Sequence, residues 1–277
     1  MSSGSVGEAA ARLLQQDCAE IQHALGDAAN IHDGVHRARK AIRRLRAALA
    51  LFETDDAPLD AVDHRLRRLA RGLSTLRDAH VIVEVAEGLG AGRDGWSGVI
   101  VRLRQRRDDL LQRACTSDPG FGRRLLSVKR AADALRGHRW DALRKRGVRA
   151  AVARSRRRVD KARRRAQDSG DVERLHAWRR RARRLRMQLD TLESLGLSAG
   201  EEDTARRKNA RSLHRLTDAL GRQQDLRMLR HCVRLMPGLA ARSMLLQQID
   251  LALDADSPQP GSSVRRPRVR PHQSVGA

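Results

Sequence analysis

Aromatic residues are scarce in this sequence. They make up 2% of the 277 residues, with two Phe, three Trp and no Tyr. Proteins that bind single-stranded nucleic acid usually stack the bases on aromatic rings. The chain is therefore poorly supplied with rings for holding a single strand in that way, whereas a ligand without bases would need no such rings.

Cysteines and long apolar runs are equally limited. The three cysteines, Cys18, Cys115 and Cys232, lie far apart and form no CxxC pair, which argues against a disulfide framework. No apolar run approaches the length of a membrane span, and the first residues lack the basic and apolar regions of a signal peptide. We therefore expect a soluble, cytoplasmic protein that does not bind membranes.

Motifs of catalysis and metal binding are also absent. The sequence contains no GxxxxGK[ST], GxGxxG or HExxH motif. His23 and His32 are too far apart to suggest a metal site, and the acids at 201–203 suit a helix N-terminus. No spacing aligns Ser, His and acidic residues into a catalytic group. The sequence predicts a protein that is not an enzyme and that needs no metal or cofactor.

Positive charge is the most abundant feature. The chain has 57 Lys and Arg against 33 Asp and Glu, which gives a net charge of +24. Only five of the basic residues are Lys. Codon bias explains the replacement of Lys by Arg, but it does not explain the excess of positive over negative charge. Such an excess opposes compaction unless an anion neutralises it, and so it predicts a polyanionic partner.

The apolar residues follow the period of helices. Leu, Ala and Val supply most of them, and the 21 Gly and 7 Pro fall largely between apolar stretches. Helices are expected at 7–26, 33–53, 58–89 with a bend near 78, 99–114, 121–136, 140–167, 172–195, 201–235 and up to about 253. The fold is therefore expected to be all-α. Residues 257–277, rich in Pro and Arg, are expected to form a disordered basic tail.

An internal repeat is the most informative motif. Residues 36–46 read HRARKAIRRLR and residues 176–186 read HAWRRRARRLR, with six identical positions at an offset of 140. A weaker match follows at an offset of 147, in which Leu66, Leu69, Leu73 and Asp78 correspond to Leu213, Leu216, Leu220 and Asp225. On a helical wheel each copy places a basic stripe opposite an apolar face. The stripes and their flanks consist of His36, Arg39, Lys40, Arg43, Arg44 and Arg46, and of His176, Arg179, Arg180, Arg183, Arg184 and Arg186.

These stripes carry an electrostatic cost. Like charges three or four residues apart destabilise a helix by about 0.2–0.5 kcal/mol per pair. A polyanion would relieve that repulsion, and the planar guanidinium fork suits phosphate oxygens. The twelve residues are therefore predicted to bind a polyanion. Two structural alternatives remain open at this point: a basic face that is simply solvated, and histidines that brace a neighbouring helix.

The doubled motif resembles the CHAD family, the conserved histidine α-helical domain. The family signature H-x-x-R-x-x-x-R-R-L-R begins here at His36 and again at His176. An L-R-D element that follows the first copy in the family is similar to 76–78, and the second copy keeps only the acid, Asp225. The resemblance covers about residues 8–253.

This resemblance implies two four-helix bundles related by pseudo-twofold symmetry around a basic central groove or pore. The domain would cover 1–256, with repeat halves at about 7–136 and 140–256. It also implies binding of inorganic polyphosphate, at polyphosphate granules in many relatives. No E-x-E-x-K motif of a CYTH domain is present, so a stand-alone CHAD protein is expected. Ala177, Trp178 and Arg181 depart from the first copy and leave open whether both halves bind equally.

Two other functions remain possible from the sequence. The basic stretch 144–166 and the tail 265–270 would suit a sequence-independent nucleic-acid-binding protein that contacts the phosphate backbone. The other possible function is that of a scaffold protein, which would recruit partners to a granule through apolar surfaces. Competition between DNA and polyphosphate would separate the first two, since both ligands are polyanions.

Overall fold

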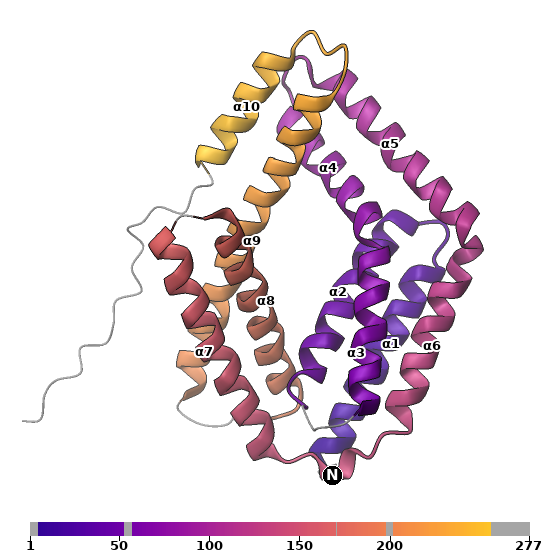
Figure 1. Cartoon of the computed structure of the whole chain (residues 1–277), viewed down its shortest axis with the longest axis vertical. Coiled ribbons are helices and arrows are strands. Elements are labelled where there is room, and N and C mark those ends of the chain that lie inside the picture. Colours follow the sequence, from indigo (N-terminus) through magenta and orange to yellow (C-terminus); the bar gives the residue numbers. More distant parts are fainter. Residues whose placement is uncertain (1–4, 53–56, 170, 198–201, 256–277) are drawn as a thin grey trace, which may run out of the picture.

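Helices build a frame whose two sides face each other. The computed structural model describes residues 5–52, 57–169, 171–197 and 202–255. The helices α2 and α4 lie on one side of the centre and α8 and α9 lie on the other (Figure 1). The expected disordered tail at 257–277 lies outside the described residues.

The described part of the chain contains helices and no strands, which confirms the all-α class. The α-helices are α1 Val6–Gly26, α2 Ile31–Leu49, α3 Ala57–Gly72, α4 Ser74–Gly90, α5 Trp96–Ser117, α6 Gly122–Arg136, α7 Lys145–Ser169, α8 Val172–Ser194, α9 Glu202–Leu235 and α10 Arg242–Ala255. Two 3₁₀ turns, η1 Pro119–Phe121 and η2 Trp140–Ala142, precede α6 and α7.

Local sequence signals explain several helix ends. Ser5 and Glu8 form a capping box at the start of α1, in which each side chain accepts a hydrogen bond from the other residue's backbone N–H. Asp171 caps α8 by accepting from the backbone N–H of Glu173 at 2.9 Å. The break between α3 and α4 falls at Leu73, about one turn before the bend expected at Asp78.

The order of helices repeats along the chain. At the offset of the basic motif, 140, α1 corresponds to α7 and α2 to α8. At the offset of the weaker match, 147, the broken pair α3–α4 corresponds to the single long helix α9. The side chains of Leu213 and Leu216, part of the weaker match, lie outside the described residues.

Each of the two hydrophobic cores takes residues from both repeat halves. The larger core joins α1, α2, α3 and α6 to α7 and α8, with Leu45 and Leu185 among its buried residues. The second core joins α4 and α5 to α9 and α10 around Trp96 and Leu229. The two halves therefore share their packing and do not bury separate cores.

Close packing of α1 on α2 sets the position of the first basic helix. A Cβ atom on Gly34 of α2 would lie 2.1 Å from the backbone oxygen of Ala24 on α1. We therefore expect Gly34→Ala to lower the free energy of unfolding by about 1–3 kcal/mol, the usual cost of overpacking. Urea unfolding measures this loss. Gly26→Ala is the control, because nothing lies within 4 Å of its Cβ, and an equal effect of both changes would contradict this packing.

Candidate polyanion-binding site

The two signature helices pack against each other. Gln188 on α8 donates a buried hydrogen bond through Nε2 to the backbone oxygen of Ala47 on α2 at 3.2 Å. The predicted apolar faces are buried, with Ala38 and Ile42 on α2 and Ala182 on α8 fully covered. Because the apolar faces are anchored, part of each basic stripe is turned toward the centre of the molecule.

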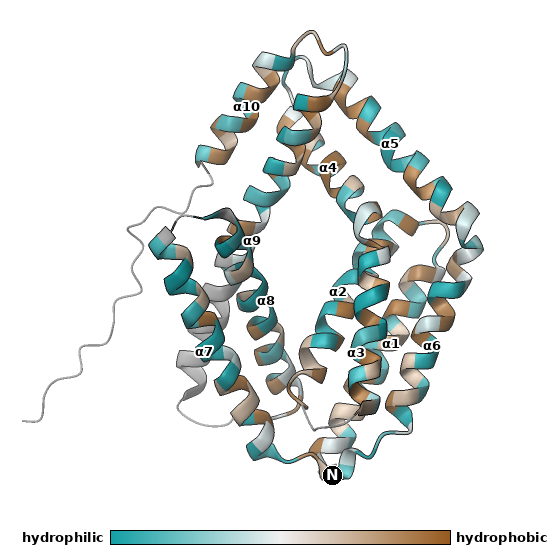
Figure 2. Ribbon diagram, in the orientation of Figure 1, coloured by the Kyte–Doolittle hydropathy of each residue, from teal (hydrophilic) through white to brown (hydrophobic). Residues whose placement is uncertain are grey.

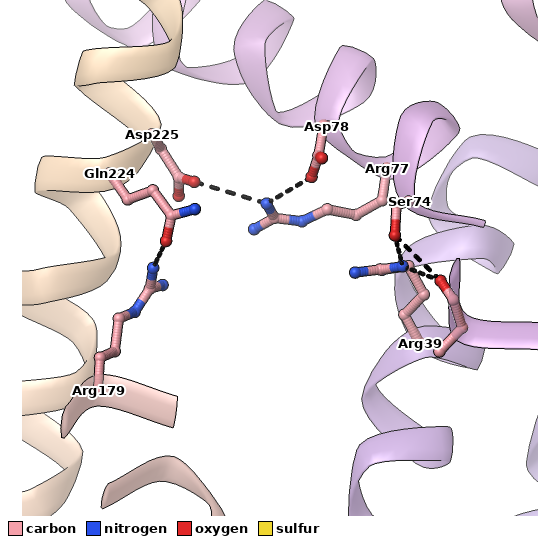
Figure 3. A network of polar contacts seen from close by, with 8 residues as sticks. Arg39, Ser74, Arg77, Asp78, Arg179, Gln224 and Asp225 are labelled. Atoms are coloured by element: carbon pink, nitrogen blue, oxygen red, sulfur yellow. Dashed lines mark hydrogen bonds and ion pairs between the residues drawn. The ribbon is translucent and has the colours of Figure 1, made fainter. Parts of the chain in front are cut away.

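Six arginines from three helices meet at this centre, and we call them the central arginine cluster. They are Arg39 and Arg43 on α2, Arg77 on α4, and Arg179, Arg183 and Arg186 on α8. Figure 3 shows Arg39, Arg77 and Arg179 extending into the space between α4 and α9. The cluster therefore combines the two stripes that the repeat predicted, with one arginine from outside them.

Arg77 connects the two halves of the molecule. Its Nη1 lies 3.2 Å from Asp78 Oδ1 on its own helix and 3.5 Å from Asp225 Oδ1 on α9 (Figure 3). Burial raises the pKa of Asp225, although the charges of Arg77 and Arg179 oppose that rise. The Asp225 carboxylate, which belongs to the second repeat half, thus offsets part of the positive charge of the cluster.

Two other arginines of the cluster are held by polar partners. Arg39 donates through Nη1 to the Ser74 hydroxyl at 2.9 Å and to the backbone oxygen of Ala70. Arg179 donates to the side-chain oxygen of Gln224 on α9 (Figure 3). These contacts are neutral, so they orient the guanidinium groups without cancelling their charge.

Repulsion is concentrated on Arg43. Burial, the largest cause, and the like charges of the neighbouring arginines together lower the pKa of Arg43 to about 10. Those neighbours are Arg39, Arg77, Arg179 and Arg186. Arg43 remains cationic at neutral pH, and it experiences charges from both repeat halves.

Arg183 experiences the same repulsion from the opposite side. Burial, the largest cause, and nearby like charges, chiefly those of Arg179 and Arg43, together lower its pKa to about 9. Nε–H groups in the cluster also lack an acceptor within the described part of the chain, namely those of Arg39, Arg43, Arg179 and Arg186. Buried donors without acceptors are costly, so the cluster is suited to an anion that supplies oxygen atoms.

The two signature histidines are half-buried beside the cluster. Burial lowers the pKa of His36, and repulsion from Arg77 and Arg43 lowers it further. Burial also lowers the pKa of His176, with added repulsion from Arg179. Both rings are therefore mostly neutral at pH 7.5, and each offers one N–H donor.

The remaining predicted site residues are not gathered in the cluster. Arg44 forms an ion pair with Asp17 of α1 at 2.6 Å, and Arg46 forms one with Asp63 of α3 at 2.7 Å. These two guanidinium groups therefore hold neighbouring helices together. Lys40, Arg180 and Arg184 have exposed side chains.

Sequence reasoning did not include Arg77 and Asp225 among the binding residues. Both lie in the weaker match after each signature copy, and Arg77 stands in the L-R-D element. The positions of Arg77 and Asp225 in this match could have marked them as candidate site residues. However, only the fold brings a residue of α4 next to one of α9.

Two further observations concern other kinds of site. Among the described residues, no three or more His, Cys, Asp or Glu side chains are placed to hold a metal ion. None of the described helices is both long enough and apolar enough to cross a membrane.

The fold and the cluster define an all-helical protein with a duplicated basic helix. A family model described as the CHAD domain matches residues 8–234, and the chain belongs to the CHAD domain family. The structure is similar to the crystal structure of the CHAD domain from the plant Ricinus communis, with a TM-score of 0.68 and 20% identity. The match covers 92% of this chain and 88% of that chain. No curated protein is a significant match.

Proposed function

We propose that this protein binds inorganic polyphosphate through the central arginine cluster. The observation that carries the proposal is the convergence of buried arginines from both repeat halves: Arg43 and Arg183 both experience the charges of Arg77, Arg179 and Arg186. Guanidinium groups bind phosphate oxygens through charge-assisted, often bidentate hydrogen bonds. A phosphate between the two stripes would relieve the repulsion and satisfy the unpaired Nε–H donors.

A chain of phosphates fits the cluster better than a single small anion. Its arginines come from three helices and both repeat halves, so several phosphates of one chain could be bound together. Binding by several linked groups raises affinity and releases counterions. The role is binding without catalysis, and we propose a cytoplasmic location at polyphosphate granules.

The direct test is fluorescence anisotropy of labelled long-chain polyphosphate, with duplex DNA and RNA as competitors at matched phosphate concentration. Tight binding that nucleic acid displaces poorly is the expected result, because the cluster lies between helices and a duplex is broad. Displacement at charge parity would instead show generic binding by the net charge of +24, and it would contradict a selective site.

Removal of the Asp225 carboxylate should strengthen binding. Asp225 lies 3.5 Å from Arg77 and competes with phosphate for that guanidinium group. We expect Asp225→Asn to lower the Kd for polyphosphate by about three- to tenfold, corresponding to about 1 kcal/mol. Asp250→Asn is the matched control, because Asp250 pairs with Arg230 outside the cluster. Equal affinity changes in the two variants would rule out competition by Asp225.

The histidines should make binding depend on pH. The pKa values of His36 and His176 lie below the ordinary 6.5 in the folded protein, and a bound phosphate should raise them. Because the bound state then takes up protons, affinity should rise as pH falls toward the bound-state pKa and be lost as pH rises through it. We expect about fivefold tighter binding at pH 5.5 than at pH 7.5, on the scale of tenfold per pKa unit.

The controls for this pH dependence separate the histidines from Asp225. The double variant His36→Gln/His176→Gln, made in an Asp225→Asn background, should bind polyphosphate equally at both pH values. A remaining fivefold change would assign the titration to other groups. Without ligand, stability should fall as pH drops below about 6.5, since histidines with depressed pKa values bind fewer protons in the folded state.

A further inference from the structure

The outer face of α7 is strongly basic. This helix of 25 residues contains eleven Lys and Arg and two Asp. Its apolar residues Val148, Val152 and Val159 are buried, and its principal neighbour is α8. Figure 2 shows α7 as mostly hydrophilic along its length, at the edge of the molecule.

The basic residues of α7 cover more than half of its circumference. At 100° per residue they fall into three rows. The middle row, opposite the buried side, consists of Arg146, Arg157 and Arg164, all exposed. One flank contains Lys145, Arg149, Arg156 and Arg163, and the other contains Arg154, Arg158, Lys161 and Arg165.

We infer that the outer face of α7 binds the phosphate backbone of duplex nucleic acid, independently of base sequence. An α-helix with its side chains is about 10–12 Å wide, and the major groove of B-DNA is about 12 Å wide. A helix of this length spans about 37 Å at 1.5 Å per residue, close to one turn of the duplex. The two flanking rows can therefore reach the phosphates on both sides of one groove.

A duplex explains this charge distribution better than other polyanions. A polyphosphate chain is a single line of charge and would use one row. An anionic membrane is bound most strongly when apolar side chains enter the headgroup region. The large apolar residues of α7 are instead buried, so the exposed face offers charge without apolar insertion.

The surface continues from α7 onto α8. A cavity of about 390 Å³ between the two helices is lined by Ala162 and Arg165 of α7 and by Arg174, Ala177 and Arg181 of α8. On the helical wheel these α8 residues lie roughly opposite the arginines that α8 contributes to the central cluster. The outer surface is therefore separate from the proposed polyphosphate site, and the inference does not depend on that site.

The test compares two triple variants of the full chain. Arg146→Gln/Arg157→Gln/Arg164→Gln removes the middle row of α7. The control, Arg67→Gln/Arg68→Gln/Arg71→Gln, removes the same charge from exposed positions on α3. Binding to a labelled duplex of about three helical turns is followed by fluorescence anisotropy at several salt concentrations near 0.1 M. Circular dichroism checks that both variants remain folded.

The α7 variant should weaken duplex binding about tenfold and reduce the slope of log K against log salt by about 2 to 3, the value for three phosphate contacts. The α3 variant should change affinity less than twofold, and Arg43→Gln/Arg183→Gln should leave duplex binding intact. Equal losses in both triple variants would overturn the inference. Unchanged duplex binding of the α7 variant would also overturn it, and lost binding of that variant to phosphatidylserine vesicles would then assign the face to an anionic membrane.

Discussion

Replacement of Arg43 and Arg183 by Gln in one variant is expected to weaken polyphosphate binding by about 100-fold or more. Each guanidinium would lose charged hydrogen bonds worth about 1.5–3 kcal/mol, and two such losses correspond to more than two orders of magnitude in Kd. These residues are the centre of the cluster, since burial and the like charges of Arg77, Arg179 and Arg186 lower the pKa of both. Anisotropy with labelled polyphosphate measures the effect.

The same variant should be at least as stable as the wild type. Removing two repelling charges relieves an electrostatic cost of the unliganded fold, so the midpoint of urea unfolding should stay or rise. The control Arg67→Gln/Arg68→Gln removes equal charge from α3 and should change the Kd for polyphosphate less than threefold. If both double variants lose affinity equally, binding depends on net charge and the cluster is not the site.

Replacement of Trp96 by Ala is expected to lower the free energy of unfolding by about 3–5 kcal/mol, the usual cost of removing a buried Trp. Trp96 is 1% exposed. Its indole N–H donates to Gln248 on α10 at 2.6 Å, and its neighbours in the second core come from both repeat halves. The change should therefore destabilise the contact between halves, and urea unfolding measures it.

Val101→Ala is the control for that change. Val101 lies on the same helix, but it is 61% exposed, so its loss should alter stability by less than about 0.5 kcal/mol. A loss below about 1 kcal/mol for Trp96→Ala would contradict the shared core. Polyphosphate binding by the folded Trp96 variant should remain close to that of the wild type, because Trp96 lies outside the central arginine cluster.

The sequence by itself determined the helices and the repeat. Apolar period, glycine positions and capping residues are local signals, and the helix bounds fall within a few residues of those expected. The doubled His/Arg motif also identified the family, which the comparison confirms. The helices and the repeat could be predicted because they depend on residues that are close together in the sequence.

Only the tertiary structure decided which parts of each stripe meet. Arg183 experiences the charge of Arg43 because α2 packs on α8, whereas Arg44 is turned to Asp17 of α1. Arg77 joins the cluster from α4. Periodicity specifies the face of a helix but not the partner that the face meets, since the partner depends on how helices distant in sequence bury their apolar sides together.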